Sequence, residues 1–440
     1  MMTVVPRTDL APLLHGLRGA VLTPAHPAFT AASRPWNLAI DQDVSAVVTA
    51  EDAADIAHLM RCAARHGLPV ATQPSGHGAT GRTGGGILLR TGRLNAISID
   101  PVARTARIGA GVRSRDLQRA AAVHGLTALP GSSPVVTVTG AALGGGLSWF
   151  GRAFGWMADS ILAAEVVLAD GSSLRVTDST DPELLWALRG GGGELAVVTA
   201  LELQLHPAPR VVGGRQLWPA QAAGEVSRAF RTITETAPPE LTLWLELLSY
   251  PGSSPMIAID STFLGEEAAA RELLAPTAAL PAPLSDTRAP LGVAELGTIT
   301  AEPTDPGPGC SRAELLTELA ESHLDALFTH PIDPLMMVQI RHLGGAFARP
   351  SDSPHGPLTE PFGLYLFGVP TSRGSRAAIR ARQAQLTAAL PTSGRVPLSF
   401  LDPSRRLSDA LPEPSLRRLR ALKSRLDPAG LLHGNVEVRR

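Results

Sequence analysis

The chain has 440 residues, which predicts two domains because a single hydrophobic core seldom extends beyond about 250–300 residues. Hydrophobic residues make up 44% of the chain and charged residues 18%, and this balance excludes a disordered protein. The formal net charge of -1 provides no basic field, so we expect neither nucleic acid nor a membrane surface as a partner.

No apolar run approaches the roughly 18 residues of a membrane span. The segment 1–24 lacks the order of a secretory signal, so we expect a cytoplasmic protein. The two cysteines, Cys62 and Cys310, are too few for a disulfide framework or a cysteine-rich metal site. We expect Cys62 to be buried in a helix and Cys310 to lie idle in a Pro/Gly loop. Basic residues are almost all arginine, with Lys423 the single lysine, and this bias indicates a GC-rich bacterial genome.

Short strands and helices alternate along the first half of the chain. The helix predicted at 52–66 has Thr49 and Asp52 in the spacing of a capping box, and Gly67 ends it. Asp170-Gly171 between two apolar runs predicts a hairpin. In chain order we predict strands at 44–49, 68–72, 87–90, 96–99, 105–110, 161–168, 173–176 and 195–205, and helices at 52–66, 114–124 and 182–188.

The composition changes after Pro207, because glycine clusters are then almost absent until Gly344-Gly345. Strand-like runs alternate with helix-like stretches and Pro-rich loops, which predicts a second α+β domain. We predict strands at 241–248, 256–263, 335–343 and 362–368, helices at 265–274, 311–327 and 376–390, and a basic helix at 414–425 followed by a closing segment at 431–438.

Glycines form four clusters between residues 76 and 193. Glycine lets the backbone approach a ligand, and successive N–H groups on such loops suit a pyrophosphate. A tight turn explains any one cluster, but four together favour a nucleotide site. Neither a P-loop nor a G-x-G-x-x-G opening a helix is present, which leaves a large nucleotide cofactor held outside these two motifs. The clusters lie at 76–86, 109–111, 140–146 and 190–193.

His77 lies between glycines in the loop 73–81, directly after a predicted strand. An isolated loop histidine is usually exposed and without function, but this one is surrounded by backbone that suits a phosphate. Imidazole can act as an acid or base, a metal ligand or a covalent attachment point. No further ligands stand nearby at metal-binding spacing, so we predict no metal site.

Several segments of the chain match one protein family. They are Ser75-Gly76-His77-Gly78, the run 130–134 leading to 140–146, the run 185–189 before 190–193, Val197-Val198-Thr199, the run 341–346, Asp427-Pro428 and Gly434-Asn435. Together they resemble the covalent-flavin oxidoreductases of the vanillyl-alcohol oxidase superfamily, and within it the berberine-bridge-enzyme-like branch. The resemblance extends from about residue 35 to the C-terminus.

The resemblance implies an α+β fold: a PCMH-type FAD-binding domain at 1–208 (core about 40–208), an antiparallel-sheet substrate domain at 209–395, and a segment at 396–440 that returns to the FAD domain. It also implies that FAD is bonded to His77. Ser133 occupies the place of the family's second attachment residue, a cysteine, so the bond should form through His77 only. The implied cofactor-binding residues are Ser75, Gly76, His77, Gly78, Ala79, Thr80, Gly81, Ser133, Val136, Thr139, Gly140, Gly144, Gly145, Gly146, Val198 and Asn435.

Two positions bear on the chemistry that the resemblance implies. Val136 corresponds to the place that faces the flavin edge where oxygen adds, and valine there is typical of oxidases; the alternative is a core residue of a strand. Many members take their catalytic base from a Tyr-x-Asn segment, but this chain has Pro397 and Ser399 there. The base is therefore unknown. Tyr365 and Glu246 are weak candidates, and the interpretation as core residues is favoured over a catalytic role.

The resemblance implies an FAD-dependent oxidase. Its expected reaction removes a hydride from a small, fairly apolar metabolite and passes the electrons to molecular oxygen, giving hydrogen peroxide, in bacterial secondary metabolism. The alternatives are a non-redox use of FAD such as a cyclisation or rearrangement, a dehydrogenase with another acceptor, and a flavin-binding protein without turnover. The sequence does not indicate the substrate or the oligomeric state.

Overall fold

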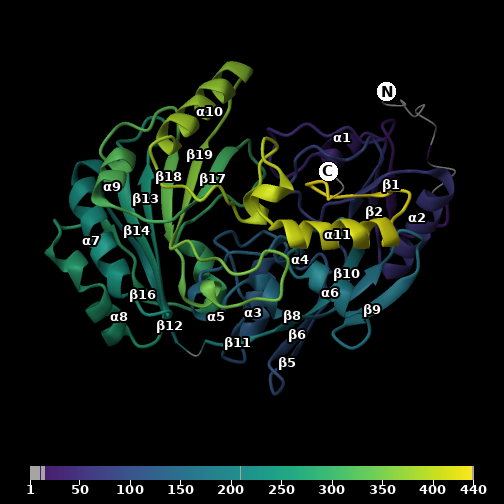
Figure 1. Cartoon of the computed structure of the whole chain (residues 1–440), viewed down its shortest axis with the longest axis horizontal. Coiled ribbons are helices and arrows are strands. Elements are labelled where there is room, and N and C mark those ends of the chain that lie inside the picture. Colours follow the sequence, from purple (N-terminus) through teal and green to yellow (C-terminus); the bar gives the residue numbers. More distant parts are fainter. Residues whose placement is uncertain (1–9, 11–14, 209, 439–440) are drawn as a thin grey trace.

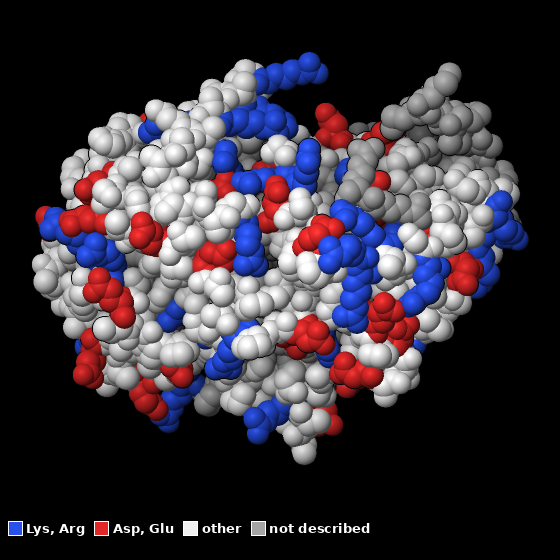
Figure 2. All heavy atoms as spheres, viewed as in Figure 1, with Lys and Arg blue, Asp and Glu red and all other residues white. Residues whose placement is uncertain are grey.

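The computed structural model describes residues 10, 15–208 and 210–438. Within these residues the strands form two five-stranded sheets, one eight-stranded sheet and one two-stranded sheet. Figure 1 shows the eight-stranded sheet on one side of the molecule and the five-stranded sheets on the other, with the long helix α11 (Glu413–Leu426) over the latter. No helix of the described chain is long and apolar enough to cross a bilayer. On the face in Figure 2, acidic and basic side chains are interspersed, as the near-zero net charge predicts.

The first five-stranded sheet has the order β1-β2-β4-β3-β20. Its β2, β4, β3 and β20 are parallel, and β1 is antiparallel to β2. Helix α2 packs on it because one helical stripe of the sequence is apolar. Gly67 ends this helix in the left-handed conformation, as predicted. The predicted capping box of Thr49 and Asp52 is wrong, because Thr49 belongs to β2 and Asp52 itself is the N-cap, accepting from the amides of Ala54 and Asp55. The bounds are β1 (Ala20–Leu22), β2 (Ala46–Thr49), β3 (Val70–Thr72), β4 (Ile87–Arg90), β20 (Leu432–His433), α1 (Phe29–Ser33) and α2 (Ala53–His66).

The second five-stranded sheet is antiparallel, with the order β5-β6-β10-β8-β9. It shares a hydrophobic core with helices α3, α4, α6 and α11. Strands β7 and β11 form a separate two-stranded antiparallel sheet, and β11 lies at the end of the first predicted domain. The bounds are β5 (Ile97–Asp100), β6 (Thr105–Gly109), β7 (Leu126–Thr127), β8 (Ile161–Val167), β9 (Ser173–Thr177), β10 (Val197–Gln204), β11 (His206–Pro207), α3 (Ser114–Ala122), α4 (Val138–Leu143), α5 (Gly151–Phe154) and α6 (Pro182–Leu188).

The eight-stranded sheet has the order β15-β12-β14-β13-β18-β19-β17, with β16 also paired to β12, and every pairing is antiparallel. Helices α7, α8, α9 and α10 share one core with it. The bounds are β12 (Val211–Pro219), β13 (Leu241–Leu248), β14 (Met256–Leu264), β15 (Ser285–Asp286), β16 (Ala289–Pro290), β17 (Cys310–Leu316), β18 (Met337–His342), β19 (Phe362–Gly368), α7 (Ala223–Thr236), α8 (Glu267–Leu273), α9 (Glu321–Phe328) and α10 (Arg373–Thr387).

The prediction of one helix at 311–327 is wrong. The structure divides this stretch into strand β17 and the shorter helix α9. Strand β17 forms because it pairs along its whole length with β19, a partner about fifty residues away. Cys310 accordingly begins a buried strand and does not lie idle in a loop, whereas Cys62 is buried in α2 as expected.

The end of the chain returns to the first part of the fold. Strand β20 pairs with β3, and Leu416, Leu419 and Leu422 of α11 are buried in the core of the second sheet. These pairings support a division of the chain near residues 208 and 396, which stays a prediction. Residues 1–9 of the first predicted domain lie outside the described chain.

Candidate cofactor site

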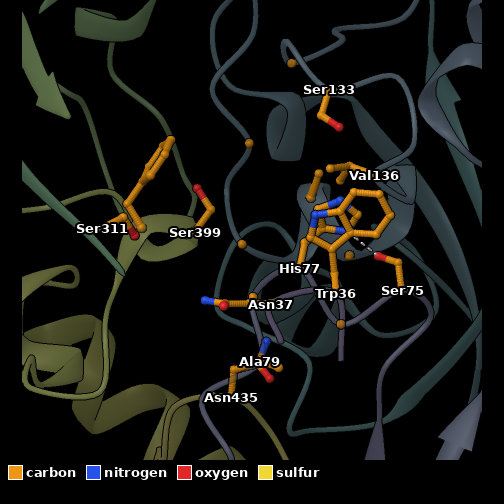
Figure 3. Close-up of a pocket in the computed structure, with 18 of the residues that line it drawn as sticks. Trp36, Asn37, Ser75, His77, Ala79, Ser133, Val136, Ser311, Ser399 and Asn435 are labelled. Atoms are coloured by element: carbon orange, nitrogen blue, oxygen red, sulfur yellow. Dashed lines mark hydrogen bonds between the residues drawn. The ribbon is translucent and has the colours of Figure 1, made fainter. Parts of the chain in front are cut away.

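A cavity of about 1110 Å³ lies between the eight-stranded sheet and the loops of the two five-stranded sheets. Ligand pockets span roughly 300–1,000 Å³, so this one can accommodate a large cofactor together with a small molecule. One wall consists of Trp36 and residues 72–80, 128–133, 136–141, 191–194 and 434–436, which lie in loops apart from the end of β3 and the first residues of α4. In Figure 3, His77, Trp36, Ser75, Ser133 and Val136 belong to this wall, and Ser311 of β17 and Ser399 lie across from it.

The loop that carries His77 follows β3 and depends on a glycine at its turn. Gly76 has φ +79°, and a Cβ there would lie 3.0–3.1 Å from atoms of Pro35 and Trp36. Any other residue would be strained at this position and would displace the preceding segment. The turn brings the imidazole of His77 under the indole of Trp36, with ring centroids 4.2 Å apart and nearly parallel planes.

The two ring nitrogens of His77 have different surroundings. Nδ1 lies 2.7 Å from the hydroxyl of Ser75, whereas Nε2 is buried and has no hydrogen-bond partner in the described chain. Burial, and then the charge of Arg113, lowers the pKa of His77 to about 4. The imidazole is therefore neutral at physiological pH, and Nε2 is the atom positioned to bond to a ligand.

Four further buried polar atoms of cavity-lining residues lack a hydrogen-bond partner among the described residues. Buried polar groups are normally paired, so a cluster of unpaired ones around one cavity fits a polar ligand. Together with Nε2 of His77, these atoms are polar groups of the cavity wall that a bound nucleotide cofactor could pair. They are Gln73 Oε1, Thr91 Oγ1, Thr139 Oγ1 and Thr300 Oγ1.

Most of the predicted cofactor-binding residues line this cavity. Gly81 and Gly145 do not: a Cβ on Gly81 would lie 2.8 Å from the carbonyl oxygen of Asp41, and Gly145 packs against Trp156. Both glycines have a positive φ, +87° and +93°, and face neighbouring parts of the chain instead of the cavity. The residues that do line it are Ser75, Gly76, His77, Gly78, Ala79, Thr80, Ser133, Val136, Thr139, Gly140, Gly144, Gly146, Val198 and Asn435.

Val136 lies in an irregular segment of the first wall, whereas Ser399 lies across from it in a short 3-10 helix, Leu398–Phe400. Val136 precedes α4, and its carbonyl accepts from the amide of Ser114 (2.9 Å), so it is not the strand core residue of the alternative interpretation. The amide of Ser399 donates to the carbonyl of Gly144 (3.1 Å), and Ser399 and Phe400 line the cavity, whereas Pro397 does not. No tyrosine therefore enters the cavity from the segment where the family places one.

Comparisons with known proteins agree with this geometry. Residues 44–177 match the family described as FAD binding domain. The chain is 35% identical over 227 residues to (R)-6-hydroxynicotine oxidase of Paenarthrobacter nicotinovorans, which covers 50% of each chain. It superposes on the crystal structure of 6-hydroxy-D-nicotine oxidase from Arthrobacter nicotinovorans with a TM-score of 0.84 and 25% identity, over 98% of this chain and 99% of that one. Residues 44–177 therefore form an FAD binding domain, and the curated relatives of the chain include FAD-linked oxidoreductases.

The fold of this oxidoreductase is that of the berberine-bridge-enzyme-like proteins. It superposes on berberine bridge enzyme from Eschscholzia californica with a TM-score of 0.83 and 17% identity, over 97% of this chain and 98% of that one. The α+β expectation is thereby confirmed. In sequence, the chain spans about half the length of the curated relatives it matches.

The second wall of the oxidoreductase's cavity carries a buried charge network. The guanidinium of Arg215 on β12 donates to both carboxylate oxygens of Asp260 on β14 (2.6 and 2.7 Å) and to Glu246 on β13 (2.6 Å). Gln339 on β18 donates to the other oxygen of Glu246. Burial, and then the charge of Glu246, raises the pKa of Asp260 to about 8 despite the opposing effect of Arg215.

Both candidate bases face this cavity. Glu246 and Tyr365 lie in its wall, on β13 and β19, together with residues that the sequence analysis did not select. Burial raises the pKa of Tyr365 although Ser311 opposes it, so its phenol stays protonated at neutral pH. The missed residues, Trp36, Asn37, Glu302 and Arg341, lie in loops or on a strand; of these, only Arg341 belongs to a segment that matched the family.

Proposed function

We propose that this oxidoreductase is an FAD-dependent oxidase acting on a small molecule, with oxygen as the electron acceptor and hydrogen peroxide as the product. The buried, unpartnered Nε2 of His77 in a glycine-lined cavity carries the proposal. The oxidase names of the relatives support it. When bound, FAD would accept a hydride from the substrate and return the electrons to oxygen.

The cofactor is covalently attached through His77 alone. Nε2 of His77 is the attachment atom, because Nδ1 is engaged by Ser75. Ser133 lines the cavity but has no thiol, and Cys62 is 3% exposed within α2. Cys310 also lines the cavity, on the opposite wall, so a peptide containing it is the sharpest control for a second bond.

Glu246 is the proton acceptor in this proposal. Tyr365 keeps its proton at neutral pH and is therefore suited to act as a hydrogen-bond donor to the substrate. Glu246 is 2% exposed and shares Arg215 with Asp260, whose raised pKa lets a proton reside in the network. Because a pKa of about 8 already keeps a proton on Asp260 at neutral pH, Glu246 is the carboxylate of this pair that is left to accept the proton of the substrate.

Acid precipitation of the purified holoenzyme tests the attachment. The precipitate should retain flavin, and mass spectrometry should find it on the peptide that contains His77. The variant His77→Ala should release all flavin on precipitation, whereas Cys310→Ser should retain it. A flavin-bearing peptide with Ser133 or Cys310 would contradict attachment through His77 alone, and loss of all flavin from the wild type would contradict covalency.

Peroxide formation tests the oxidase. The second candidate function is a cyclisation or rearrangement in which FAD has no net redox role, and the absence of a cavity tyrosine at Pro397–Ser399 favours it. The oxidase should form one hydrogen peroxide for each product, whereas the second candidate should form none. An acceptor dye that is needed for turnover would indicate a dehydrogenase. The fairly apolar substrate, the cytoplasmic location and the role in bacterial secondary metabolism stay predictions.

A further inference from the structure

Arg341 on β18 is held in the second wall of the cavity by aromatic rings and one amide. Its guanidinium carbon lies 4.0 Å from the ring centroid of Trp244, 5.2 Å from that of Phe400 and 5.8 Å from that of Tyr365. Its Nε donates to the side-chain oxygen of Gln339. Stacking and this hydrogen bond fix the plane of the guanidinium.

The amide of Gln339 has a fixed orientation because Glu246 accepts its NH2 group. Its oxygen must therefore face Arg341, where it occupies only Nε. No hydrogen bond or ion pair joins the two terminal nitrogens of Arg341 to any residue in the described chain, and Arg341 lines the cavity. The guanidinium thus presents two adjacent N–H donors and a positive charge to whatever fills the cavity.

The neighbouring carboxylates form no ion pair with Arg341 in the described chain, although Glu302 and Glu246 lie close enough to favour its charged form. Glu246 uses one oxygen for Gln339 and the other for Arg215, and Arg215 in turn binds Asp260. Glu302 also lines the cavity, but burial raises its pKa, and it forms no ion pair with Arg341 within 4.0 Å. A planar cation in the cavity wall that has no directly paired carboxylate among the described residues matches the two oxygens of a substrate carboxylate.

We propose that Arg341 binds a carboxylate of the substrate, so that the oxidase acts on a small carboxylic acid with an apolar body packed against Tyr365 and Phe400. Gln339 is a positioning residue for Arg341. The substrate class rests on the proposed oxidase function, but binding at Arg341 is measurable without turnover. The expectation of a fairly apolar metabolite is thereby narrowed to one with an apolar body and an acidic end.

Titration calorimetry of the holoenzyme with benzoate, benzamide and benzylamine tests the carboxylate preference. The three probes share a ring and differ in charge, so their affinities isolate the charged end. Benzoate should bind at least tenfold more tightly than either of the others, since charge-assisted bidentate pairs are about twice as strong as neutral hydrogen bonds. Tighter binding of benzylamine, equal binding of all three, or binding of none overturns the proposal.

Variants assign the preference to Arg341. Arg341→Gln should weaken benzoate binding by roughly tenfold to a hundredfold and leave benzamide within about twofold. Arg341→Lys should retain part of the affinity for benzoate, because it keeps the positive charge but loses the two adjacent N–H donors of the guanidinium. Arg380→Gln, at an exposed cavity-lining position on α10, is the matched control and should stay within about twofold of wild type. An equal loss from Arg380→Gln would mean that the overall positive potential of the cavity causes the preference for benzoate. The proposed contact between Arg341 and the carboxylate would then be wrong.

Flavin content and reoxidation of the photoreduced enzyme, measured on the same samples, separate this proposal from the oxidase function. Normal benzoate selectivity with slow reoxidation in air would refute the oxidase and leave the carboxylate site standing. Rapid reoxidation without benzoate selectivity would refute the carboxylate site alone. Loss of flavin from Arg341→Gln, with the fold intact by circular dichroism, would place Arg341 on the cofactor and overturn the proposal.

Discussion

Three neighbours determine the surroundings of the His77 imidazole. Gly76 bends the chain under Trp36, Ser75 engages Nδ1, and burial keeps the ring neutral. Either ring nitrogen of a histidine can form a bond in principle, whereas here the hydrogen bond at Nδ1 leaves Nε2 available. The same burial leaves Nε2 without a partner, a cost that bonding to a ligand would remove.

At the scale of single residues, Val136→Leu should separate the two halves of the oxidase reaction. Val136 lines the cavity, and an added methylene takes up space in a close-packed wall. Substrate-driven flavin reduction should persist, while reoxidation in air should slow by about tenfold, a barrier increase of about 1.4 kcal/mol. Anaerobic reduction followed by mixing with air measures each half. Reoxidation at the wild-type rate would leave Val136 as a packing residue only.

Replacement of the two candidate bases should give unequal losses. Glu246→Gln keeps the shape of the side chain but cannot take up a proton, so flavin reduction by substrate should slow by roughly 10²–10⁴-fold. Tyr365→Phe removes only a hydroxyl that stays protonated and should cost about tenfold or less. Stopped-flow measurement of anaerobic flavin reduction gives both rates. A larger loss from Tyr365→Phe would reverse the two roles.

Some residues of this site can be predicted from the sequence and others cannot. His77 is found because glycines flank it, and Glu246 and Tyr365 are found because they lie on recognisable strands. That both side chains face one cavity depends on the alternation of each strand and on a pairing order that joins β13, β18 and β19. Glu302 enters from an irregular loop, and no local pattern indicates where that loop lies.

At the scale of elements, the same limit applies to strands and helices. Local periodicity locates α2, α6, β4, β13 and β19 well, because each shows its own apolar pattern. It merges β17 and α9 into one helix, since the sequence 311–327 also spaces its leucines for a helix and only pairing with β19 makes the first part a strand. Helix α7 and strand β12 are absent from the predicted elements, although both contribute buried residues to the core of the eight-stranded sheet.

The junction of α11 with β20 is built around the only lysine of the chain. Lys423 is 1% exposed, and its ammonium donates to Asp427 (2.7 Å) and to the carbonyls of Glu194 (2.6 Å) and Leu432 (2.7 Å). Three acceptors around a point suit a compact ammonium with three donors, whereas a planar guanidinium needs a fork of acceptors. This explains why a chain so rich in arginine keeps a lysine here.

Lys423→Met should destabilise the protein by about 3–5 kcal/mol, because it removes the cation that faces buried Asp427 and leaves two carbonyls without their donor. Lys423→Arg keeps the charge but overfills the site, so a loss of about 1–3 kcal/mol is expected. The exposed pair of Arg425 with Glu183 provides a control: Arg425→Met should cost about 1 kcal/mol or less. Urea unfolding measures all three, and equal stability of Lys423→Arg and wild type would contradict the geometric argument.

At the scale of the whole molecule, Arg152 connects the two sides of the fold. It belongs to α5, is 5% exposed, and donates to the carbonyls of Leu241, Ala237 and Leu343 on the side of the eight-stranded sheet. Close by, Trp149 stacks on Trp244 with ring centroids 3.7 Å apart. These contacts fix the distance between the sheets, and thereby the width of the cavity between them.

His342 makes this junction sensitive to acid. It is 7% exposed and accepts from Arg152 at Nε2 (3.0 Å); burial, and then the charge of Arg152, lowers its pKa to about 3. The unfolded chain, with an ordinary histidine pKa of about 6.5, binds the proton that the folded state refuses. Between these two values stability must fall as the pH falls.

From pH 7 to pH 5, His342 should account for a loss of about 2 kcal/mol in unfolding free energy, since the unfolded state takes up nearly one proton over about 1.5 pH units. His342→Asn cannot titrate but can still accept from Arg152, so the variant should lose about 2 kcal/mol less than wild type over this range. His66→Asn, at the exposed end of α2, should leave the difference unchanged to within about 0.5 kcal/mol. Urea unfolding at the two pH values measures these differences. An identical pH dependence in His342→Asn and wild type would mean that His342 is protonated inside the fold, and that acid leaves the junction with Arg152 unaffected.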